Sequence, residues 1–248
     1  MKTSTVNILK KSLFLAFILI AVTAVISIVI KYNVEGEKSL PYSVKEILIT
    51  SHTDANDNEE KSQDVIWDIN LKEDNNIYIY LEKNDDETKE TIKEVKINNF
   101  KITKKPKLGN IKIYRPTGDL GSELYKLSTQ DYFNNEIIYN GASVDTLKNL
   151  EIRNEGGMIG FRVSLENLGN YTSNESVTYD GRLLSEIGVT NEDMKFSISF
   201  DLTITLDNNV SFVGTYNLDL PYGDVINEKE PNQTLTEKDL KNVTFKRK

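Results

Sequence analysis

KFSISFDLTITLDNNVSFVGTYNLDL, residues 195–220, is the stretch that decides the fold of this chain. Apolar and polar residues alternate on both sides of Asp207-Asn208-Asn209, which is the period of a β-strand with one buried face. Asn and Asp tolerate the left-handed backbone of tight turns, so the segment predicts a long antiparallel hairpin. The apolar face before the turn consists of Phe196, Ile198, Phe200, Leu202, Ile204 and Leu206.

A second stretch, residues 65–81, has the same form and predicts a second hairpin with its turn at Asp74-Asn75-Asn76. Its apolar positions are Val65, Trp67, Ile69 and Leu71 before the turn, and Ile77, Ile79 and Leu81 after it. If those positions form the core, Tyr78 and Tyr80 point outward side by side. Outward aromatic rings can bind a sugar or a partner protein, although a loop or a second sheet can also cover them.

Several shorter alternating runs complete the pattern. They are residues 44–49, 95–102 with a β-bulge at Asn98-Asn99, 111–113, 159–165 and 243–246 with Phe245 as a buried anchor. Helical signals are confined to residues 181–188, ending at Gly188, and to one turn at 236–240. Many short strands and few helices predict a mostly β fold, an antiparallel β-sandwich of about nine or ten strands. We expect it to occupy residues 43–248 as one domain, the alternative being two β domains split near 116–140.

An uncharged, apolar run occupies residues 12–30. Such a length matches the hydrocarbon thickness of a bilayer, and a helix satisfies its own backbone groups there. We therefore predict a transmembrane signal-anchor that contacts membrane lipid, between a basic cytoplasmic start (1–11) and a polar stalk (31–42). The residues expected to face lipid are Leu13, Phe14, Phe17, Ile20, Val25, Ile28 and Ile30.

The lysines on the N-terminal side of this run set the expected orientation. Lys2, Lys10 and Lys11 precede the run without any acid, so the positive-inside rule places the N-terminus in the cytoplasm and the rest of the chain outside. The alternative is a signal peptide cleaved after Ala24. Cleavage there would leave an apolar new N-terminus, which favours the uncleaved anchor.

The charge and the cysteine content limit the partners and the cellular location that this chain can have. The formal charge of −8 includes three lysines in residues 1–11, so the remainder carries −11. An acidic domain argues against nucleic-acid partners, which need clustered basic residues. The absence of cysteine excludes disulfides and, together with an outside location, fits the surface of a Gram-positive bacterium.

The candidate metal site is a run of oxygen-bearing side chains: Asp54, Asn56, Asp57, Asn58 and Glu59. Their spacing begins like a calcium loop, but Glu59 and Val65 stand where an EF-hand needs Gly and a bidentate Glu. A looser calcium site formed by Asp54, Asp57, Glu59 and Glu60 remains a hypothesis beside that of a solvated acidic loop, and no other cofactor is expected. His52 is the single histidine and is expected in an exposed loop, with no zinc set or Ser-His-Asp motif around it.

These observations predict a non-enzymatic binding or accessory component of the bacterial cell envelope, anchored by a single span, whose partner is an envelope protein or glycan. The first alternative is a protein that binds or hydrolyses cell-wall glycan, on the strength of Tyr78 and Tyr80. The second is a calcium-stabilised adhesive module.

Overall fold

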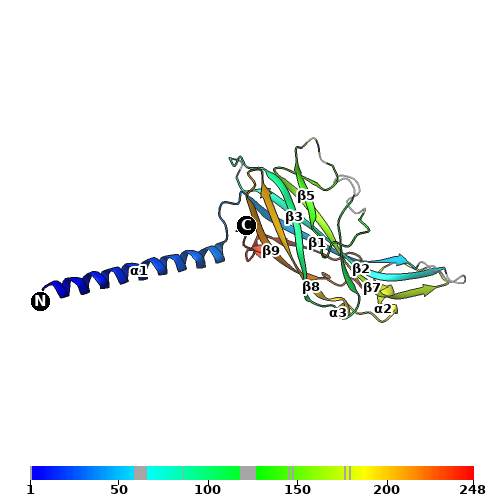
Figure 1. Cartoon of the computed structure of the whole chain (residues 1–248). Helices are drawn as coiled ribbons and strands as arrows, with labels where there is room; N and C mark the ends of the chain where they lie inside the picture. Colours follow the sequence, from blue (N-terminus) through cyan, green and yellow to red (C-terminus); the bar gives the residue numbers. More distant parts are fainter. Residues whose placement is uncertain are drawn as a thin grey trace.

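The computed structural model describes residues 2–58, 66–85, 87–117, 127–144, 146, 148–175, 177–178 and 180–248. Helix α1 (Lys2–Glu35) is long and projects away from the rest of the chain (Figure 1). Its segment Leu13–Asn33 is 21 residues long, apolar enough to cross a membrane, and not buried against any other described part of the molecule. The rest is mostly strand, so the predicted mostly β class behind one N-terminal apolar helix is confirmed.

Eleven strands belong to one sheet in the described part of the chain. They are β1 (Tyr42–Asp57), β2 (Trp67–Lys83), β3 (Ile92–Lys104), β4 (Asn110–Tyr114), β5 (Ile137–Ala142), β6 (Glu151–Arg153), β7 (Gly156–Ser173), β8 (Phe196–Leu206), β9 (Ser211–Leu220), β10 (Asn232–Thr236) and β11 (Lys246–Arg247). The short helices are α2 (Arg182–Glu186), α3 (Asn191–Met194) and α4 (Glu237–Leu240). Helices α2 and α4 fall where the sequence predicts them, whereas α3 was not predicted.

The strand order is β10-β1-β2-β7-β6-β5-β3-β8-β9-β11, with β4 paired to β7. The sheet curls on itself like half a barrel (Figure 1). Three strands separate β7 from β8 in that order, yet the ring centroids of Phe161 on β7 and Phe200 on β8 lie 5.1 Å apart. The curl thus encloses one hydrophobic core on the inner face of the sheet. The predicted two-layer sandwich is not confirmed, because inner-face residues pack across the curl of a single sheet.

The hairpin at residues 195–220 is confirmed. Strands β8 and β9 pair from Phe196↔Leu220 to Thr205↔Ser211, and the turn places Asn209 in the left-handed region with φ of 63°. The predicted β-bulge at Asn98-Asn99 is confirmed as well, since Asn99 has φ of 53° and the β3–β8 register shifts there.

The hairpin predicted around Asp74-Asn75-Asn76 is wrong. Residues 67–83 form the single strand β2, which pairs with β1 on one side and with β7 on the other. All three residues of the predicted turn are buried in the middle of that strand. Partners from distant parts of the chain satisfy their side chains, which removes the need for a solvent-exposed turn.

The segment predicted as a stalk is short and packed. Helix α1 runs to Glu35, and the chain then turns at Gly36 (φ of 72°) into β1. A Cβ added at Gly36 would lie 2.7 Å from the carbonyl oxygen of Phe245, so this position needs glycine for both space and conformation. Phe245 precedes β11 and packs against the core, with its ring 6.4 Å from that of Tyr216.

Candidate functional site

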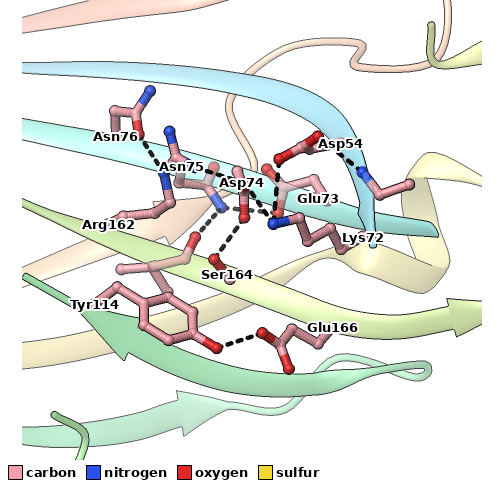
Figure 2. Close-up of polar contacts among 12 residues, drawn as sticks. Asp54, Lys72, Glu73, Asp74, Asn75, Asn76, Tyr114, Arg162, Ser164 and Glu166 are labelled. Atoms are coloured by element: carbon pink, nitrogen blue, oxygen red, sulfur yellow. Dashed lines mark hydrogen bonds and ion pairs between the residues drawn. The ribbon is translucent and has the colours of Figure 1, made fainter. Parts of the chain in front are cut away.

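The long strands β1, β2 and β7 lie side by side, and their even-numbered side chains face away from the core over the paired segment around residue 76. At the centre of this outer face is a polar cluster drawn in Figure 2. Its members are Asp54 on β1, Lys72, Asp74 and Asn76 on β2, and Arg162 and Ser164 on β7.

Asp74 is the hub of the polar cluster and is completely buried. Its carboxylate accepts hydrogen bonds from Arg162 Nη1, at 2.9 Å, and from the hydroxyl of Ser164 (Figure 2). Arg162 Nε donates to Asn76 Oδ1 at 2.7 Å. A buried carboxylate is stabilised only when such partners replace its water, so the arrangement holds β2 and β7 in one register.

Lys72 extends the polar cluster to β1. Its Nζ lies 3.4 Å from Asp74 Oδ2 and 3.1 Å from Asp54 Oδ2. Burial raises the pKa of Asp54, but the charge of Lys72 together with hydrogen bonds with the Ala55 N–H, Lys72 and Asp74 lowers the pKa overall. The two carboxylates of the cluster therefore face two cations, Lys72 and Arg162, and each charge has a named partner.

A second polar chain runs on the inner face of the same strands. Ser51 Oγ donates to Asn75 Oδ1 at 2.7 Å, and Asn75 Nδ2 donates to Glu73 Oε2 at 2.8 Å. Glu73 is fully buried, and burial, followed by the neighbouring charge of Asp74, raises its pKa well above the usual range. The protonated form of Glu73 is therefore favoured within the core.

Strand β4 adds a third polar group beside the cluster. The Tyr114 hydroxyl donates to Glu166 Oε1, and Lys112 Nζ lies 2.8 Å from Glu166 Oε2. Burial, together with the carboxylate of Glu166, raises the pKa of Tyr114 (Figure 2). This contact ties β4 to β7 and leaves the tyrosine as a neutral donor.

Next to the polar cluster, toward α1, the outer face carries large apolar and aromatic side chains, with the exposed Glu46 of β1 opposite Tyr80. Tyr80 pairs with Met158, and the two side chains are 39% and 43% exposed. Tyr78 is half-buried between Leu48 on β1 and Gly160 on β7. We call Leu48, Tyr78, Tyr80 and Met158 the tyrosine patch. The two tyrosines do share the outer face, with Tyr80 the more accessible of the two.

The candidate calcium ligands are dispersed. Asp54 contacts Lys72, and Asn58 donates through its side chain to Asp68. Asn56 and Asp57 are exposed on successive positions of β1, which point to opposite faces. No group of three Asp, Glu or His residues in the described part of the chain is placed to hold a metal ion. Glu59 and Glu60 lie outside the described residues, so the calcium site stays a prediction.

His52 differs from expectation. It lies on β1 opposite Asp74 and is half-buried, whereas the sequence predicts an exposed loop. Burial lowers its pKa, and its Nδ1 is buried without a hydrogen-bond partner among the described residues. With Asp54, Arg162, Lys229 and Glu230 it lines a shallow hollow at the edge of β1.

Sequence reasoning missed the polar cluster and Met158. A signal existed, because Arg162, Ser164 and Glu166 alternate with the buried Phe161, Val163 and Leu165. That alternation shows that the three polar side chains lie on one face of the strand. It does not show which residues of other strands contact them. Arg162 and Ser164 find their partners on β2, 88 residues away for Arg162 and Asp74, and Glu166 finds its partner Tyr114 on β4, 52 residues away.

The comparisons add no assignment: no protein-family model, curated protein or solved structure matches this chain.

Proposed function

We propose that this chain is a non-enzymatic binding component of the bacterial cell envelope, held by α1 in the membrane with its β domain outside the cell. Its partner is another envelope protein, which contacts the tyrosine patch. The exposed pair of Tyr80 and Met158 is the observation that carries this proposal.

The tyrosine patch has the composition of a protein interface. Tyr and Met are enriched in interfaces because tyrosine offers a large rigid surface and methionine adapts its shape. Tyr80 on β2 and Met158 on β7 lie directly opposite each other and are both exposed to water. Together they form an accessible apolar surface that a partner can bury. The neighbouring polar cluster keeps β2 and β7 in register, so it fixes the positions of both side chains.

The charged groups of this face favour binding over catalysis. Catalytic acids and bases need access to substrate, and Asp74 on this face is fully buried, as is Glu73 on the inner face. The more accessible Asp54 and Glu166 are each engaged by a lysine. These charged side chains connect neighbouring strands, and the surface left for a partner is the tyrosine patch, bordered by the exposed Glu46.

Site-specific photocrosslinking tests the proposal. A benzoylphenylalanine at Tyr80, in the full-length chain expressed in cells, should give an adduct with an envelope protein, and Met158→Glu should abolish it. The same photoreactive residue at Thr215, exposed on β9, is the control and should give none. Equal adducts at both positions would show that the patch has no special role. A hydrolytic activity abolished by one acid substitution would contradict the non-enzymatic assignment.

A glycan partner is the second candidate, favoured by the shared orientation of Tyr78 and Tyr80 on one face. Aromatic rings on a flat strand surface can stack on sugar rings. Binding to a glycan array that is weakened by Tyr78→Ala and Tyr80→Ala would favour this candidate over the protein partner. An array without signal would remove it.

A further inference from the structure

The C-terminal tail, Lys246-Arg247-Lys248, lies where α1 enters the β domain (Figure 1). Lys246 Nζ donates to Asn33 Oδ1 at 2.9 Å, and the backbone N–H of Arg247 donates to the hydroxyl of Tyr32 at 3.0 Å. Tyr32 and Asn33 are the last residues of the apolar span Leu13–Asn33. If that span crosses a bilayer, the tail is held at the level of the lipid headgroups.

The tail also pairs with strand β9, so its backbone is held in place by the β domain as well as by α1. Lys246 and Arg247 pair with Val213 and Phe212 on β9, and the N–H of Lys248 donates to Ser211 O at 2.9 Å. The backbone N–H of Glu37 donates to Phe245 O at 2.7 Å just before the tail. These contacts join the first residues after the span to the last residues of the chain.

The charge of the tail is opposite to that of the domain as a whole. The part of the chain after residue 11 carries −11, and such a charge is repelled by an anionic membrane surface. Lys246, Arg247 and Lys248 are all exposed, and no ion pair in the described part of the chain involves them. The pKa of Glu37 is lowered first by hydrogen bonds with Ser39 and to a smaller extent by Arg247, and the pKa of Glu136 is lowered first by its hydrogen bond with Asn98 and to a smaller extent by Lys248.

We propose that Lys246, Arg247 and Lys248 bind anionic phospholipid headgroups beside the point where α1 leaves the bilayer. This inference rests on the proposed membrane anchor. Each basic residue close to an anionic surface raises the binding constant for that surface by about fivefold. Three such residues therefore form an effective electrostatic contact. The contact holds the β domain against the bilayer and offsets the repulsion of its acidic surface.

The full-length chain in lipid nanodiscs provides the test. Discs of phosphatidylcholine are compared with discs that also contain phosphatidylglycerol, an anionic lipid. We expect the amides of Glu37, Arg247 and Lys248 to exchange with solvent several-fold more slowly in the anionic discs. The slowing should disappear at high salt, because screening weakens exposed charges, and in the triple variant Lys246→Gln, Arg247→Gln, Lys248→Gln.

A matched triple variant is the control: Lys101→Gln, Lys104→Gln and Lys105→Gln. These lysines are exposed at the end of β3 remote from α1 and should not alter the lipid dependence. Equal exchange of the tail in both kinds of disc would overturn the headgroup contact while leaving the anchor intact. A chain that fails to enter either kind of disc would instead contradict the proposed anchor, on which the contact depends.

Discussion

Glu73 shows how one residue can control the pH dependence of stability. Its side chain is fully buried and its pKa is raised well above the usual range, first by burial and then by the charge of Asp74. Because the folded pKa exceeds the unfolded one, folding takes up a proton between the two values. The contribution of Glu73 to stability is therefore fully present below the unfolded pKa and is lost as pH rises toward the folded pKa.

Replacing Glu73 by Gln should remove this dependence. Gln keeps the shape and the hydrogen bond to Asn75 but does not titrate. We expect Glu73→Gln to raise the free energy of unfolding at pH 7 and to flatten its decline above about pH 4.5, which is at most about 1.4 kcal/mol per pH unit for one proton. Denaturant unfolding of the full chain in detergent at several pH values measures this. The exposed Glu82→Gln serves as control, and an unchanged slope in Glu73→Gln would refute the assignment.

Arg162 and Arg182 form a matched pair of arginine–aspartate contacts. Arg162 contacts the fully buried Asp74 at 2.9 Å, and Arg182 contacts Asp180 at 2.7 Å with its side chain 65% exposed. Removing one partner of a buried pair leaves an uncompensated charge, whereas solvent replaces an exposed partner. We expect Arg162→Met to lower the free energy of unfolding by about 3–5 kcal/mol and Arg182→Met to lower it far less. Equal losses would show that the polar cluster is not a structural tie.

Among the secondary-structure elements, strand β2 is one that the local sequence pattern does not predict correctly. Asp74-Asn75-Asn76 and Asp207-Asn208-Asn209 have the same composition, and the alternation of apolar residues keeps its phase across both. One is the middle of a strand and the other is a turn. The difference comes from Ser51, Arg162 and Ser164, which satisfy the first set of side chains from other strands. Such distant partners leave no local signal.

Amide exchange distinguishes a strand from a turn directly. The backbone of residues 74–76 lies between β1 and β7, so we expect these amides to exchange as slowly as those of Ile77 and Ile79. The turn at residues 207–209 is an internal control within the same molecule and should exchange faster. Equally fast exchange at both sites would restore the hairpin that the sequence predicts.

For the whole molecule, the sequence predicts the secondary-structure elements better than their arrangement in space. The apolar helix, the β8–β9 hairpin and the bulge at Asn98-Asn99 follow from local patterns. The curl of one sheet does not, because it depends on contacts such as that of Phe161 with Phe200 across the core. The tyrosines were predicted to face outward from strand alternation alone, but Met158 opposite Tyr80 depends on the β2–β7 register.

We propose that α1 spans a membrane and that the β domain lies outside the cell. The chain contains no cysteine, so a single engineered one reports its own location. A membrane-impermeant maleimide should label Thr129→Cys, which is exposed on the β domain, in intact cells. Thr3→Cys should be labelled only after the cells are permeabilised. Labelling of Thr3→Cys in intact cells, or protection of Thr129→Cys, would show that the orientation is wrong. Loss of the N-terminal cysteine from the mature chain would show that the helix is cleaved and does not remain as an anchor.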